Sequence, residues 1–169
     1  TINSNKSNGL KTKNTDETGS ALEFKKLTSN PDGLKVLDVD RDGLQDILIF
    51  ITYELPILVR QVQKRQFEIV DSPKALASLI KDASLRSTTL ANVDGRSGRE
   101  LLVAQKNFAR SLVFTEEQNW SIIDQYNAKN TENQISTLGV FYIYGECLET
   151  GPAILLLDGR KGQLQVLET

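Results

Sequence analysis

The chain of 169 residues contains no histidine, which is both the commonest general base and the commonest metal-binding side chain in proteins. It has a single cysteine, Cys147, so an internal disulfide cannot form. No apolar run approaches the roughly 18 residues of a membrane span, and no signal peptide is visible. These absences exclude imidazole chemistry, a disulfide framework and a spanning helix.

The charges are nearly balanced, with 20 basic and 22 acidic residues and a net charge of −2. No basic excess favours nucleic acid as a partner. The length suits one ordinary domain with a real core. The chain begins with Thr1 and contains no methionine, so we expect a processed or partial piece of a longer product.

Local composition changes along the chain. Residues 1–20 are rich in Asn, Ser, Thr, Lys and Gly, which predicts a flexible leader or linker. From Ala21 onward, short runs of Val, Ile, Leu, Phe and Tyr alternate with turn residues and predict strands. One helix is expected, capped by Ser72, with Pro73 in its first turn and its end near Ala83.

The chain also repeats itself. The runs 46–49, 100–103 and 153–156 are 54 and 53 residues apart, and 67–71 matches 120–124 at an offset of 53. Strands are expected at 34–40, 46–53, 56–62, 66–71, 87–93, 100–106, 109–115, 119–125, 136–144, 153–158 and 163–168.

Four short strands per unit of about 50 residues are typical of β-propeller blades. The sequence therefore predicts an all-β chain with blade units 34–86, 87–135 and 136–169, and a strand at 21–27 that belongs to an adjoining or closing blade. A β-sandwich with accidental internal similarity is the alternative. Propellers have about 4–8 blades, so we expect further blades, or other copies of the chain, to complete the ring.

The first repeat holds a concentrated set of acids at its first turn. Asp38, Asp40, Asp42 and Asp46 occupy positions 1, 3, 5 and 9 of a loop, and Gly43 occupies position 6, where a tight turn needs a positive φ. Crowded carboxylates repel one another unless a cation lies among them, and Ca²⁺ prefers such oxygen ligands. A solvated acidic turn is the alternative.

This loop and the apolar run after it resemble the FG-GAP/VCBS repeat family of β-propellers, which includes the calcium loops of integrin α-chains. The resemblance implies that Asp38, Asp40, Asp42 and Asp46 bind Ca²⁺ through side-chain oxygens and Leu44 through its backbone carbonyl. It also implies an extracellular, periplasmic or cell-surface location, because loops of this kind work best at about millimolar calcium.

The matching loops of the other two repeats are altered. Asn92, Asp94 and Glu100 keep the spacing, but Arg96 stands where Asp42 stands in the first loop. We expect the Arg96 guanidinium to pair with Asp94 or Glu100 in place of a metal. In the third repeat the spacing falls on Gly145, Cys147, Glu149 and Ala153, or else there is an insertion around residues 145–151. In either case the ligand set is lost.

These observations favour a non-catalytic module over an enzyme. No nucleophile motif is present, and the densest carboxylates lie in a single loop. We expect a calcium-stabilised propeller module for protein or glycan interaction or for structural assembly, with other chains or blades as partners. The alternative is an accessory subunit, or a fragment, of an extracytoplasmic enzyme complex whose active residues lie elsewhere.

Overall fold

The computed structural model describes residues 10–15, 19–24, 30–70, 79–142 and 151–168. Within them the chain is all β and contains no helix, so none could cross a membrane. The strands, in chain order, are β1 (Leu10–Thr15), β2 (Gly19–Phe24), β3 (Pro31–Leu37), β4 (Asp46–Ile51), β5 (Ile57–Gln63), β6 (Gln66–Val70), β7 (Thr88–Ala91), β8 (Glu100–Gln105), β9 (Phe108–Phe114), β10 (Trp120–Asn127), β11 (Ile135–Phe141), β12 (Ala153–Asp158) and β13 (Gln163–Leu167).

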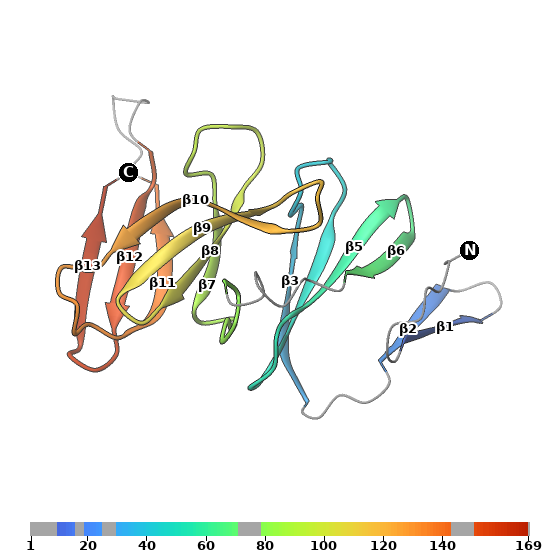
Figure 1. Cartoon of the computed structure of the whole chain (residues 1–169), viewed down its shortest axis with the longest axis horizontal. Coiled ribbons are helices and arrows are strands. Elements are labelled where there is room, and N and C mark those ends of the chain that lie inside the picture. Colours follow the sequence, from blue (N-terminus) through green and yellow to red (C-terminus); the bar gives the residue numbers. More distant parts are fainter. Residues whose placement is uncertain (1–9, 16–18, 25–29, 71–78, 143–150, 169) are drawn as a thin grey trace.

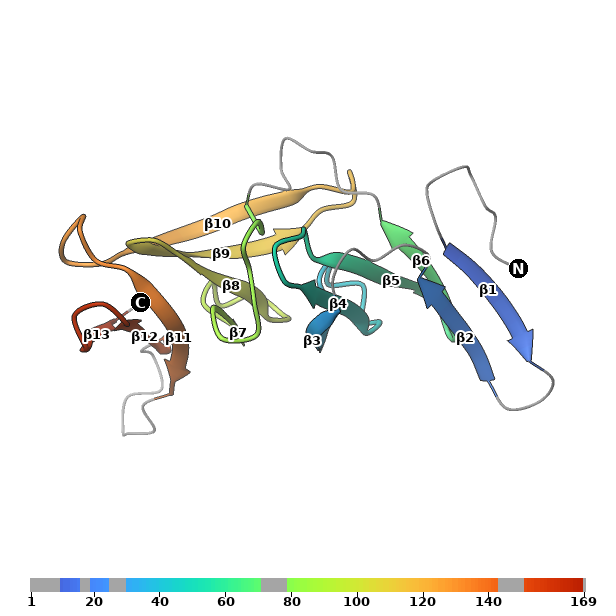
Figure 2. The same ribbon diagram turned by 90° about the horizontal axis from the view of Figure 1, so that it is seen from below.

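The strands form three antiparallel meanders in which each strand pairs with its neighbours in the chain. Sheet I contains β3 to β6, sheet II contains β7 to β10, and sheet III contains β11 to β13. The sheets follow one another along the molecule in chain order and do not close into a ring (Figures 1 and 2). The strands expected from residue 34 onward are therefore confirmed, with shifts of a few residues at their ends.

A separate two-stranded hairpin precedes sheet I. It pairs β1 with β2 and lies beyond β6 at the N-terminal end of the molecule (Figures 1 and 2). The expected strand 21–27 corresponds to β2, whereas β1 lies inside residues 1–20, where a flexible leader was expected. Leu10 is the only large apolar residue of β1, so the hydrophobic pattern that reveals the other strands is missing there.

Two apolar cores join the three sheets. The first lies between sheets I and II and includes Leu48, Phe50, Leu101 and Trp120. The second lies between sheets II and III and includes Leu102. Because successive residues of a strand point to opposite faces, β8 supplies Leu101 to one core and Leu102 to the other.

Backbone contacts add to this packing. The Phe114 N–H of sheet II donates to the Val39 carbonyl of the loop after β3, over 2.8 Å. The Leu138 N–H of sheet III donates to the Arg86 carbonyl before β7, over 3.3 Å. Most of the helix expected between Ser72 and Ala83 lies outside the described residues, and its described end forms turns.

Candidate metal centre

The loop between β3 and β4 folds around its own carboxylates. The two oxygens of Asp38 accept the N–H groups of Asp42, at 3.1 Å, and Gly43, at 2.9 Å. The Leu44 N–H donates to Asp42 Oδ1 over 2.7 Å. Arg41 and Gly43 adopt positive φ values of 62° and 87°, which bring the acids to the inside of the turn.

Three of the four predicted acidic ligands come together. One oxygen from each of Asp38, Asp40 and Asp42 lies within 4.8 Å of the others, in an arrangement that could hold a metal ion. Asp46 has a different position, because it is fully buried and accepts the N–H groups of Val39, at 2.9 Å, and Gln61, at 2.8 Å. Asp46 therefore fastens the loop to β5.

The charges around Asp46 show how crowded the acids are. Burial raises the pKa of Asp46, the N–H groups of Val39 and Gln61 lower it, and the charges of Asp40 and Asp42 raise it further. The net effect is a pKa above the ordinary value for aspartate. A cation among these carboxylates would oppose that repulsion.

Sequence reasoning missed a positive neighbour of the loop, Arg60 on β5. Its Nε lies 2.5 Å from Asp40 Oδ2, and its Nη atoms lie 3.9 Å from Asp42 and 3.7 Å from Glu68. Three loop carboxylates and one guanidinium leave a charge of −3 + 1 = −2, before Glu68 is counted. The residues therefore fit a divalent cation in both charge and chemistry.

The loop between β7 and β8 keeps part of this hydrogen-bond pattern. The Gly95 N–H donates to Asn92 Oδ1 and the Arg96 N–H donates to Asp94 Oδ1, each over 2.9 Å. Glu100 is buried, like Asp46, and accepts the Val93 N–H over 2.6 Å. Two contacts therefore recur 54 residues later. The Arg96 N–H donates to Asp94 as the Asp42 N–H donates to Asp40, and Glu100 accepts the Val93 N–H as Asp46 accepts the Val39 N–H.

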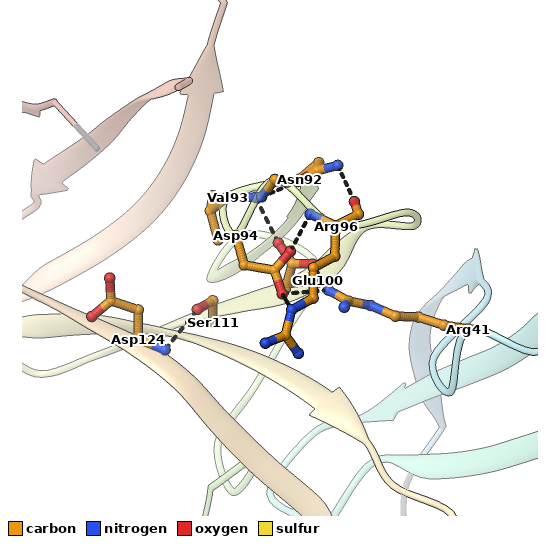
Figure 3. Close-up of polar contacts among 9 residues, drawn as sticks. Arg41, Asn92, Val93, Asp94, Arg96, Glu100, Ser111 and Asp124 are labelled. Carbon is orange, nitrogen blue, oxygen red and sulfur yellow. Dashed lines mark hydrogen bonds and ion pairs between the residues drawn. The ribbon is translucent and has the colours of Figure 1, made fainter. Parts of the chain in front are cut away.

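The cation of this second loop is Arg41, which belongs to the first. Arg41 Nη2 lies 3.0 Å from Asp94 Oδ2 and also pairs with Glu100 (Figure 3). Burial alone would lower the pKa of Arg41, but the hydrogen bonds and charges of Asp94 and Glu100 raise it above its ordinary value. The guanidinium therefore stays charged and pairs with both carboxylates.

Arg96 makes the expected pair with Asp94, but only at long range. Its side chain is 76% exposed, and its Nε lies 3.9 Å from Asp94 Oδ2. Arg41 is better placed because it crosses from the adjacent loop where sheets I and II meet (Figure 3). Burial raises the pKa of Asp94, but the Arg96 N–H and the Arg41 guanidinium outweigh burial and hold it below the ordinary value.

Sheet III uses a carboxylate differently. Asp158, at the end of β12, accepts Asn133 Nδ2 at 2.7 Å, the Gln134 N–H at 3.2 Å, and the N–H groups of Arg160 and Lys161 at 2.8 and 2.9 Å. Asp158 thus holds the turn between β12 and β13 and the segment before β11.

The altered third loop lies mostly outside the described residues. This applies to Gly145, Cys147 and Glu149, whereas Ala153 is buried at the start of β12. Comparisons of the chain with protein-family models, with curated proteins and with solved structures found no match. The resemblance to FG-GAP/VCBS repeats therefore depends on residues 38–46 and on the 53–54-residue period.

Proposed function

We propose that this chain is a non-catalytic β-propeller module that acts in assembly or in protein or glycan interaction. Three consecutive antiparallel meanders pack face to face in chain order, each beginning near the same point of the repeat. Stacked sheets of this kind are the building plan of propeller blades. This repeated packing is the observation that carries the proposal.

We further propose that Ca²⁺ binds at the first loop. Asp38, Asp40 and Asp42 would supply side-chain oxygens, and Leu44 its backbone carbonyl, toward a shell of about 6–8 oxygens. Asp46 already accepts two N–H groups, so its main part in the site is to hold the loop in place. The ion would supply positive charge to a loop that the Arg60 guanidinium neutralises only in part.

A role in binding or assembly agrees with the chemistry of the chain. There is no histidine to act as a base, and the buried acids Asp46, Glu100 and Asp158 all accept hydrogen bonds that hold loops. Calcium in such a loop stabilises a turn, and about millimolar calcium is found outside the cytosol. We place the protein in an extracellular or periplasmic setting on that ground.

Calcium binding is tested by thermal unfolding of the whole chain with calcium, magnesium or chelator. Calcium at 100 times its Kd should add about 2.7 kcal/mol to the free energy of unfolding. For a chain of this size that corresponds to a rise in Tm of about 5–11 °C. Asp42→Asn should remove most of the rise, because it removes one negative charge from the three-carboxylate group.

The matched control is Asp82→Asn, which makes the same change at an exposed turn outside the loop. It should keep the full response to calcium. If neither calcium nor Asp42→Asn changed the Tm, the calcium site would be refuted. An equal rise with magnesium would contradict selectivity for calcium.

A further inference from the structure

Each sheet has two faces with distinct packing partners. The forward face, which packs against the next sheet along the chain, includes Leu48 in sheet I and Leu102 in sheet II. The backward face, which packs against the preceding sheet, includes Leu101 in sheet II and Ile154 in sheet III. Leu48 and Leu102 are 54 residues apart, so equivalent residues have equivalent partners.

The forward face of sheet III has no neighbour among the described residues. On it, Leu164 and Val166 of β13 are 60% and 58% exposed. Val166 pairs with Leu155 across the strands as Leu58 pairs with Leu48 in sheet I. Leu58 is only 1% exposed because sheet II covers it. Phe141 and Leu157 extend this open apolar face.

The backward face of sheet I is open along β3. Leu34 and Val36 are 58% and 50% exposed. Their equivalents in sheet II, 54 residues later, are Thr88, which is 3% exposed, and Leu90, which packs against the first core. The two ends of the molecule therefore present the two complementary kinds of face, one forward and one backward.

We propose that a second copy of this chain covers these faces, so that sheet III of each copy packs on sheet I of the other. The proposal rests on the proposed propeller function and names the partner. The proposal continues the packing seen inside the chain. Sheet I packs on sheet II, and sheet II packs on sheet III, through these same kinds of face. Sheets I and III do not meet in this structure, because they lie on opposite sides of sheet II (Figures 1 and 2).

The strand count supports the same pairing. Sheet III has three strands where sheets I and II have four. Strand β6, the fourth strand of sheet I, comes directly before the first strand of sheet II. Strand β2 comes directly before the first strand of sheet I, so it has the position in the chain that a fourth strand would have. The hairpin that carries β2 lies beyond β6 in both views (Figures 1 and 2). In the pair, β2 of one copy would take the fourth-strand position beside the three described strands of sheet III in the other.

Two interfaces of this head-to-tail kind close on themselves and give a finite pair. The pair would contain 3 + 3 = 6 stacked sheets, which lies within the range of about 4–8 blades for propellers. Sedimentation equilibrium of the full chain should then give twice the chain mass of 18.8 kDa. A single species of 18.8 kDa at all concentrations would overturn the proposal, and so would a ladder of larger species.

Charged variants of the two faces test which faces meet. Leu164→Glu alters only the forward face of sheet III, and Leu34→Glu alters only the backward face of sheet I. In a head-to-tail pair, each variant places a carboxylate in both interfaces, so each should weaken association by roughly a hundredfold or more. Tyr53→Glu, at a loop residue that is 97% exposed, is the matched control and should leave association unchanged.

Mixing the two variants gives the decisive result. A mixed pair has one interface with both changes and one interface with neither, so association should return in part on mixing. Loss of the pair with Leu164→Glu but not with Leu34→Glu would show that two copies of sheet III meet each other, and would overturn the proposal. A chain that pairs without any response to calcium would refute the calcium site alone, whereas a calcium-responsive monomer would refute this inference alone.

Discussion

Replacing Arg41 tests the ion pair that joins the first two repeats. In the Arg41→Ala variant, Glu100 would be fully buried without its ion-pair partner, and Asp94 would keep only the more distant Arg96, at 3.9 Å. Removing one partner of a buried pair costs about 3–5 kcal/mol. The Arg41 side chain is 19% exposed, so water would reach part of the site, and we expect a loss near the lower limit, about 3 kcal/mol.

The backbone of Arg41 provides an internal check on that figure. Its φ of 62° is strained for any residue with a Cβ, and Gly95 has the equivalent position in the second loop, with a φ of 72°. Arg41→Gly removes the ion pair and also the strain, which is worth about 1 kcal/mol. Arg41→Gly should therefore be less destabilising than Arg41→Ala by that amount.

Urea unfolding followed by the fluorescence of Trp120 gives the free energy of unfolding. Trp120 is the only tryptophan of the chain and is buried in the first core. For this chain length, a loss of about 3 kcal/mol also lowers the Tm by roughly 6–12 °C. Because Gln at position 100 can still accept the Val93 N–H, Glu100→Gln completes a double-mutant cycle. A loss below about 0.5 kcal/mol for Arg41→Ala, or an additive cycle, would refute the ion pair as the cause.

Two further variants test neighbouring features. Gly98→Ala should lower the free energy of unfolding more than Gly95→Ala, because both glycines have a positive φ but a Cβ at Gly98 would lie 3.1 Å from Arg41 Cγ; in an Arg41→Ala background, urea unfolding should show a smaller difference between the two losses. Burial opposes ionisation of Asp158, but the N–H groups of Lys161, Gln134 and Arg160 outweigh burial and lower its pKa below 3.8. The stability that this carboxylate adds should be present above about pH 4 and lost as the pH falls through its lowered folded pKa. Asp158→Asn should therefore reduce the fall in Tm as the pH is lowered below about 4. An unchanged fall in Tm would contradict a stabilising role for the Asp158 carboxylate.

The strands from residue 34 onward could be predicted because each contains an apolar run bounded by Gly, Asp, Asn or Pro. The turns around Asp38 and Asn92 could be predicted because spacing alone places their acids on the inside of a loop. Strand β1 could not, because Leu10 is its only large apolar residue, so little beyond its backbone pairing with β2 marks it as a strand.

The cations of the two loops could not be assigned from spacing. Arg41 pairs with carboxylates 53 and 59 residues away in the chain, and Arg60 pairs with carboxylates 8 to 20 residues away. These contacts depend on how the sheets and strands pack. Arg96, which lies inside the second loop, was the natural choice by sequence. It does pair with Asp94, but at 3.9 Å and with a side chain that is 76% exposed. A hint was present in the pattern, because Arg41 stands where the second loop has Gly95.

The position of Arg41 has a consequence for how the repeats can be separated. In many repeat proteins each unit contributes its own stability and interacts with its neighbours only through a surface. Here the second repeat contains two acids that pair with a guanidinium of the first, 53 and 59 residues earlier in the chain. A fragment beginning after residue 86 would retain the strands of sheet II but lose the guanidinium that its loop requires. Repeats one and two thus form one cooperative unit, and a cut between them would divide a charge pair as well as an apolar core.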